Sequence, residues 1–168
     1  FINLSIGKTN LHFPFSGKWV IKVFRGNLSA TIDERGRIRI PSGFLDLLRE
    51  KYGDELFITS ITGEYLKLYP MGVWEEIEQK LLKIPSMNTS RAKLLGRLTY
   101  FGSSIRLDKA GRILIPQRLR TAASLSDEVA VLGYLDSLEI WAPEKFLEHM
   151  KEEPLTAEDF ALLSDLGV

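Results

Sequence analysis

Cysteine is absent from this chain of 168 residues, and histidine occurs only twice, as His12 and His149. The absence of cysteine excludes disulfides, thiolate zinc sites and cysteine nucleophiles. The two histidines lie far apart in sequence, without a neighbouring cluster of carboxylates, which disfavours a histidine metal centre or a Ser-His-Asp triad. We therefore expect no metal site, no cofactor, no catalytic residue and no bound small molecule.

Long apolar runs are also missing. Residues 1–23 are interrupted by Asn, Lys, His and Pro, so they lack the unbroken apolar stretch of a signal peptide or a membrane span. Hydrophobic residues nevertheless make up 45% of the chain, which is enough to build a folded core. We expect a globular protein of the reducing cytoplasm that does not associate with membranes.

The whole chain has no excess of either charge, but individual segments do. The 22 Lys and Arg residues balance 22 Asp and Glu residues. Residues 1–52 contain nine basic and four acidic residues, residues 85–120 contain eight basic residues and only Asp108, and residues 144–168 contain two basic and seven acidic residues. The two basic zones can attract phosphates, although a solvated charged face is the commoner explanation of such clusters.

A motif of nine residues occurs twice. Asp33–Pro41 reads DERGRIRIP and Asp108–Pro116 reads DKAGRILIP, with six identical positions at an offset of 75 residues. A weaker correspondence continues downstream, where Asp54 and Glu55 match Asp127 and Glu128. The chain is therefore interpreted as one module written twice.

The same order of elements is predicted in each module. An alternating stretch at 28–32 or 104–107 predicts a half-buried strand, and the Asp and Gly of the motif predict a hairpin-like reversal. The strand that follows the turn is predicted to point its two Ile side chains to one face. The opposite face carries Arg37 and Arg39 in the first copy and Arg112 and Leu114 in the second. The motif proline ends this strand and favours a helix start. The further predicted elements are helices at 42–51, 72–83, 117–123 and 144–151 and strands at 55–61, 65–69, 128–133 and 137–141.

A separate helix is predicted between the modules. Pro85 breaks the chain, and one of residues 88–90 caps a helix that runs to about Phe101. Its apolar residues at helical spacing favour a packing stripe over a cofactor site; they are Leu94, Leu95, Leu98 and Phe101.

The tail begins with a capping-box pattern, Thr156 with Asp159, followed by a short amphipathic helix to Leu166 that is acidic and expected to be peripheral. The expected organisation is an extension at 1–22, a first module at 23–84, a connecting helix at 85–102, a second module at 103–151 and an acidic tail at 152–168.

These features resemble the MraZ family of bacterial transcriptional regulators, which are built from two tandem modules of the AbrB type. The similarity rests on Phe24–Asn27 (FRGN), on the doubled motif and on Glu139–Trp141 (EIW). It implies a mainly β fold with short helices (α+β), in which swapped-hairpin β-barrel modules assemble into ring-shaped homo-oligomers. It also implies a nucleoid-associated repressor that binds promoter repeats of the division and cell-wall gene cluster.

The family hallmark, an Asp with an Arg four positions later, matches both copies of the motif. Guanidinium groups suit phosphate oxygens and guanine edges, so the predicted DNA-binding residues are Arg35, Arg37, Arg39, Lys109 and Arg112. The acids and glycines are predicted to organise the turns, the acids by accepting backbone N–H groups and orienting an Arg; they are Asp33, Gly36, Asp108 and Gly111. Ala110 stands where the first copy has Arg35, so the second turn is expected to hold DNA less tightly. The plainer alternative is a tight turn closed by a weak surface ion pair.

Two other classes of function compete with DNA binding. Two Asp residues can in principle form an acid/base pair, but no Ser-His pair or Gly-rich phosphate loop accompanies them, so we do not expect an enzyme. The alternative is an oligomeric protein-assembly module without specific DNA binding, whose Arg residues meet the acidic tail of a neighbouring subunit. Because one module covers little duplex, we expect a homo-oligomer that binds double-stranded DNA with direct repeats.

The first 22 residues have no counterpart before the second module and are expected to form a poorly structured extension. Family members typically have the initiator Met where Val23 stands, and the GTG codon of valine can serve as a bacterial start. In the alternative, Phe13, Phe15 and Trp19 pack on the fold, or Lys18 and Lys22 add non-specific attraction to DNA.

Overall fold

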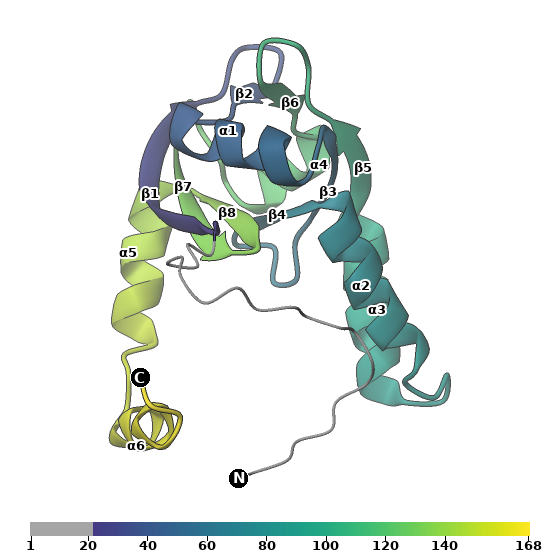
Figure 1. The fold of residues 1–168 in the computed structure, drawn as a ribbon, viewed down its shortest axis with the longest axis vertical. Coiled ribbons are helices and arrows are strands. Elements are labelled where there is room, and N and C mark those ends of the chain that lie inside the picture. The colour runs from purple at the N-terminus through teal and green to yellow at the C-terminus, as the bar shows by residue number, and fades with distance from the viewer. Residues whose placement is uncertain (1–21) are drawn as a thin grey trace, which may run out of the picture.

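The computed structural model describes residues 22–168, and the expectations for residues 1–21 lie outside this range. The described chain combines a six-stranded antiparallel sheet, a separate two-stranded ribbon and short helices (Figure 1). This arrangement confirms the predicted mixed α+β class.

Each repeat contributes the same series of elements. The first repeat contains β1 (Phe24–Thr31), β2 (Arg37–Arg39), α1 (Ser42–Lys51), β3 (Glu55–Thr59), β4 (Leu66–Pro70) and α2 (Met71–Leu82). The second contains β5 (Ser103–Arg106), β6 (Arg112–Leu114), α4 (Gln117–Ala122), β7 (Glu128–Leu135), β8 (Ser137–Trp141) and α5 (Pro143–Glu152). Helix α3 (Thr89–Phe101) connects the repeats, and α6 (Ala157–Asp165) follows the second one.

Local chemistry sets where the helices begin. The motif prolines are the N-cap residues of α1 and α4, where their fixed φ, −55° at Pro41 and −53° at Pro116, ends the strand. Asn88 caps α3, and its side chain accepts a hydrogen bond of 2.9 Å from the backbone N–H of Arg91. These starts agree with the helices predicted at 42–51 and 117–123 and with the cap predicted at one of residues 88–90.

The strands of the two repeats are exchanged within the sheet. The order is β1-β7-β8-β4-β3-β5, so each end strand pairs with a strand of the other repeat. Strand β1 pairs with β7 and strand β5 with β3, both antiparallel. Because equivalent strands occupy equivalent places from either end, the sheet has a pseudo-twofold axis between β4 and β8.

The chain reverses at the first motif as predicted, but the strand after the turn, β2, does not form its ladder with the strand before the turn. After the first turn, the strand pairing of β2 with the preceding segment is limited to the isolated bridge between Ile32 and Ile38. Its ladder forms with β6 of the other repeat, where Arg37 lies opposite Leu114 and Arg39 opposite Arg112. The two motif turns therefore project together from one end of the molecule, at the top of Figure 1.

The main core lies under the ribbon and combines equivalent residues of both repeats. Ile38 and Ile113 are almost fully buried, as are Ile40 and Ile115, whereas the alternate residues of β2 and β6 point outward. The motif isoleucines thus anchor the ribbon to the core, as the alternating pattern predicts.

Helices α2 and α3 form a pair that extends from the sheet on the right of Figure 1. Trp74 stacks on Phe57 with ring centroids 4.0 Å apart and belongs to a buried cluster with Tyr69, Leu81 and Leu98. Leu94 and Leu95 pack against this cluster, so the stripe on α3 serves packing, as predicted. No helix between residues 22 and 168 is long and apolar enough to cross a membrane.

The second repeat ends in another aromatic cluster. Trp141 stacks on Tyr65 at 4.3 Å, and its indole N–H donates to the buried Glu139 at 2.9 Å. Lys67 lies 3.4 Å from the same carboxylate, and its sequence equivalent in the other repeat is Glu139 itself. This ion pair therefore sits at the pseudo-twofold axis, between the central strands β4 and β8.

Candidate nucleic-acid interface

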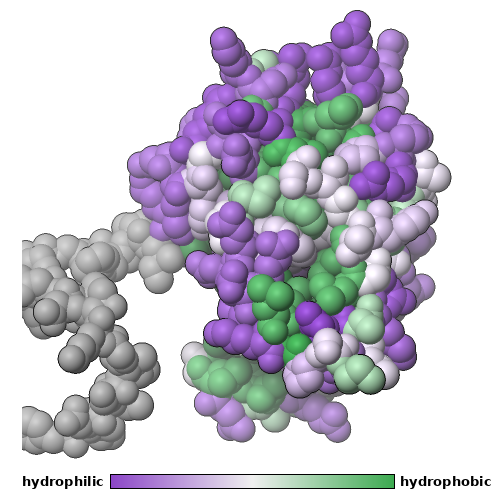
Figure 2. All heavy atoms as spheres, turned by 90° about the vertical axis from the view of Figure 1, so that its right-hand side faces the viewer, coloured by the Kyte–Doolittle hydropathy of each residue, from purple (hydrophilic) through white to green (hydrophobic). Residues whose placement is uncertain are grey.

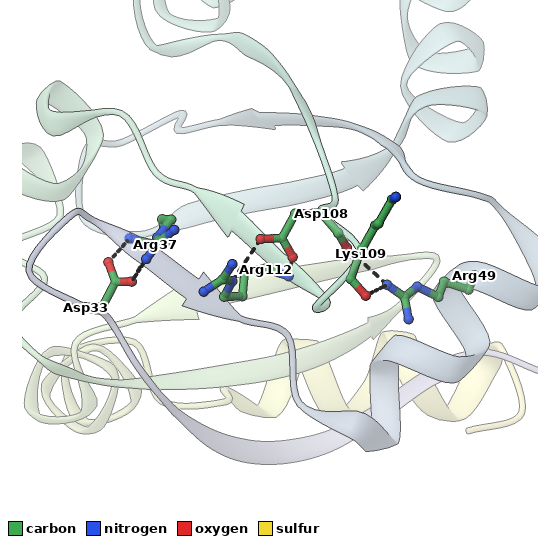
Figure 3. Close-up of polar contacts among 6 residues, drawn as sticks. All are labelled: Asp33, Arg37, Arg49, Asp108, Lys109 and Arg112. Carbon is green, nitrogen blue, oxygen red and sulfur yellow. Dashed lines mark hydrogen bonds and ion pairs between the residues drawn. The ribbon is translucent and has the colours of Figure 1, made fainter.

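The first motif turn is organised around the carboxylate of Asp33. Its Oδ1 accepts the backbone N–H groups of Arg35 at 3.0 Å and Arg37 at 2.9 Å, and its Oδ2 accepts the Arg37 Nε at 2.9 Å. The backbone closes the same turn, because the Gly36 N–H donates to the Asp33 carbonyl at 2.8 Å. One carboxylate thus shapes the loop and orients one guanidinium, as Figure 3 shows.

The second turn repeats this geometry. Asp108 accepts the backbone N–H of Arg112 through Oδ1 and the Arg112 Nε through Oδ2, both at 2.8 Å. Gly36 and Gly111 occupy φ values of 78° and 75°, which a residue with a Cβ adopts only with strain. The shared Asp, Gly and Arg therefore produce the same loop twice.

Both carboxyl groups ionise more readily than an ordinary Asp. The backbone N–H of Arg37 is the main cause of the lowered pKa of Asp33. Desolvation is the next largest effect and opposes it, and the Arg37 side chain lowers this pKa further. The pKa of Asp108 is lowered in the same way by Arg112. Both acids are therefore charged at neutral pH.

The structure brings the sequence-predicted site residues together at the end of the ribbon. Arg37 and Arg112 are partly buried by their turns, whereas Arg35, Arg39 and Lys109 are exposed. Leu114 occupies the remaining outward position and is 55% exposed. Figure 2 shows the corresponding upper end of the molecule as mostly hydrophilic surface.

Each turn is supported by the helix of the other repeat, a feature that the sequence reasoning missed. A Cβ added to Gly36 would meet the Arg120 guanidinium at 2.6 Å, and one added to Gly111 would meet Leu45 Cδ2 at 2.5 Å. Leu45 and Arg120 are separated by the same 75 residues as the motifs, so the repeat offset was a signal for their shared position. The glycines therefore allow close packing of each turn on a helix, in addition to the positive φ.

Arg49 of α1 gives the second turn further support. Its guanidinium NH2 donates to the carbonyls of Asp108 at 3.0 Å and Lys109 at 3.1 Å (Figure 3). The repeat-equivalent residue of Arg49 is Ser124, so no periodic signal in the sequence pointed to this contact. Arg49 thus holds the turn that carries Ala110 in place of an arginine.

Other kinds of site lack support in the described part of the chain. Residues 22–168 contain no group of three or more His, Asp or Glu side chains arranged to hold a metal ion. Asp33 and Asp108 each bond their own turn, rather than facing each other as an acid/base pair would (Figure 3).

Comparison with known proteins agrees with this architecture. The family model for the MraZ protein, which is described as antitoxin-like, matches residues 23–97 and 102–165. A transcriptional regulator MraZ of Acidobacterium capsulatum is 40% identical over 146 residues, covering 87% of this chain and the whole relative. Proteins of the same name from Koribacter versatilis and Clostridium acetobutylicum are 41% and 34% identical over 147 residues, again along their whole length. The chain, which has two copies of the Asp-Arg turn next to the paired strands β2 and β6, belongs to the MraZ family.

Proposed function

We propose that this protein is a transcriptional regulator that binds double-stranded DNA with the paired turns and the outer face of the β2–β6 ribbon. The observation that carries the proposal is the pairing of Arg39 directly opposite Arg112, with Arg37 beside them. Like charges opposite each other destabilise a strand pair, so their presence on an exposed face favours an anionic ligand. A two-stranded ribbon also has the width that the major groove of B-DNA admits.

The site residues divide into two groups by their environment. Arg37 and Arg112 are held by Asp33 and Asp108, so they lose little conformational freedom on binding, which supports assigning the contacts with base edges to them. Arg35, Arg39 and Lys109 are exposed, and no ion pair connects them to an acid within residues 22–168. These three residues contact phosphates, which strengthens binding without selecting sequence.

One ribbon covers only a short stretch of duplex. A homo-oligomer that repeats the ribbon at a fixed spacing gains affinity by linking the contacts, and it selects DNA that carries direct repeats. On the resemblance to the family, we propose a ring of swapped-hairpin barrels that represses the division and cell-wall gene cluster and associates with the nucleoid. The relatives named as transcriptional regulators support the regulatory role.

The test measures fluorescence anisotropy on the duplex upstream of the protein's own gene and on a scrambled duplex. Wild type should prefer the upstream duplex, and the double variant Arg37→Ala, Arg112→Ala should lose this preference. Arg25→Ala, Lys151→Ala is the matched control, because it removes two exposed positive charges from β1 and α5, away from both the ribbon and the α2–α3 pair. If both double variants lost the preference equally, the effect would come from the total positive charge of the protein and not from the ribbon. An oligomer that binds neither duplex would favour the protein-assembly module.

A further inference from the structure

An open groove lies between α2 and α3 where they meet the sheet. It has a volume of about 630 Å³, and its lining includes Phe57, Trp74, Leu81, Leu95, Leu98 and Arg91. Leu82 lines it at 66% exposure, and Met87, in the connection between α2 and α3, is 90% exposed. Figure 2 views this side of the molecule and shows hydrophobic surface in its lower half, bordered by hydrophilic residues. Apolar side chains gathered on one exposed face indicate a binding surface.

Helix α6 also exposes apolar side chains that no other part of the described chain covers. It has nine residues and a complete capping box, yet none of its residues is buried. Two of its apolar side chains are largely exposed, Phe160 at 58% and Leu162 at 60%, and the C-cap residue Leu166 is 70% exposed. A helix this short is marginal in water without a packing partner. The capped start and the apolar surface therefore point to a partner for α6.

Charge identifies the groove as that partner. Residues 79–97 contain five basic residues and no acid, and Glu78 is the one acid among the residues that line the groove, whereas residues 153–168 contain four acids and no basic residue. Figure 1 places α6 below α5 on one side of the sheet and the α2–α3 pair on the opposite side. We infer that α6 of one copy of the chain docks in the α2–α3 groove of a second copy, with its acids facing the basic end of the helix pair.

Such a contact is heterologous, because two different surfaces of the chain meet. It leaves a free groove and a free α6 on each dimer and thus adds further copies until the assembly closes. The inference deepens the homo-oligomer of the proposed function and rests on it.

Because the chain has no natural cysteine, disulfide crosslinking provides a direct test. Gln79 lines the groove and Ser164 lies on α6, and both are exposed. The full chain carrying Gln79→Cys and Ser164→Cys should form a ladder of covalent multimers under mild oxidation. The control with Ser126→Cys and Ser164→Cys should stay mainly monomeric on the same gel. No ladder, or an internal disulfide within one chain, would overturn the inference.

A second measurement uses exposed apolar residues, whose replacement is expected to leave the fold of one copy intact. Phe160→Asp and Leu82→Asp should each reduce the mass of the assembly in light scattering. An unchanged mass would contradict the docking. A loss of mass on deletion of residues 1–21, but not with Phe160→Asp, would identify that segment as the occupant and overturn the inference.

Binding to the upstream duplex is measured in parallel. Crosslinking without preference for this duplex would refute the DNA-binding proposal but support the docking. Preference for the duplex without crosslinking would refute the docking alone.

Discussion

Leu114 is the residue at which the outer face of the ribbon departs from its own symmetry. It corresponds to Arg39 in the other repeat and lies opposite Arg37. The face therefore carries three arginines and one leucine, and the leucine is more than half exposed. This asymmetry offers a way to separate the requirements of folding from those of binding.

We predict opposite effects of Leu114→Arg on stability and on DNA affinity. The new charge faces Arg37, so the free energy of unfolding should fall by less than about 1 kcal/mol. Affinity for duplex should rise, and the slope of log K against log salt should steepen by about 0.9 for one added phosphate contact. Urea unfolding and anisotropy titrations over a salt series measure the two effects. Leu135→Arg is the control for general charge, because Leu135 is exposed at the far end of β7. An equal gain in the control would contradict the prediction.

Asp33 and Asp108 predict a pH dependence with a definite sign. A carboxyl whose pKa is lowered by folding stabilises the folded state above its unfolded pKa, and this contribution disappears as pH falls through the folded pKa. The pKa of both groups is lowered chiefly by a backbone N–H group. The stabilisation should therefore be complete at neutral pH and decline below the ordinary Asp value of about 3.9.

The double variant Asp33→Asn, Asp108→Asn isolates this contribution, since the amide keeps the size of the side chain but not its charge. The wild type should be more stable than the variant at pH 7, and the difference should shrink as pH decreases below about 3.9. Urea unfolding over a pH series checks this, and a pH-independent difference would show that the two charges do not matter for the turns.

At the scale of elements, the contact between β1 and β7 depends on a glycine. A Cβ on Gly133 would lie 2.4 Å from the backbone N of Arg25 and 2.5 Å from the carbonyl carbon of Phe24. Backbone atoms cannot move aside as a flexible side chain can, so a larger residue would separate the strands. Strand β1 has its ladder with β7, and the exchange between repeats depends on this pair.

We therefore predict that Gly133→Ala lowers the free energy of unfolding by about 1–3 kcal/mol through overpacking. Gly96→Ala provides a matched control of opposite sign. Gly96 lies within α3 with open space around its Cβ position, and the exchange should stabilise the helix by up to about 1 kcal/mol. Denaturant unfolding of both variants tests the pair, and a neutral Gly133→Ala would mean that β1 can shift without cost.

At the scale of the whole molecule, the proposed oligomer predicts that DNA affinity depends on the helical phase between two direct repeats. Ribbons held at fixed spacing reach two direct repeats only when both repeats face the same side of the duplex. Two repeats should therefore bind much more tightly than one, and an insertion of about 5 bp, half a helical turn, should remove most of this gain. Anisotropy titrations on three duplexes of equal length provide the measurement. Equal affinity for all three would show that the ribbons act independently.

Local sequence was sufficient to predict the motif turns and most of the elements. The Asp and Gly chemistry acts within five residues, the prolines begin α1 and α4 at the expected places, and Thr156 with Asp159 forms the predicted capping box. The identical motif at an offset of 75 residues also revealed the repeat. These features could be read because each depends on backbone preferences and hydrogen bonds between near neighbours in the chain.

The tertiary structure alone decided how the repeats combine. Strand β2 bonds to β6 and β1 to β7, and both partners come from the other half of the chain. An alternating pattern indicates which face of a strand is buried but not which strand lies beside it, so the approach of Arg39 to Arg112 could not be predicted. The support of the second turn by Arg49 was hidden for the same reason, because its acceptors are carbonyls 59 and 60 residues away whose direction is set only when the core assembles.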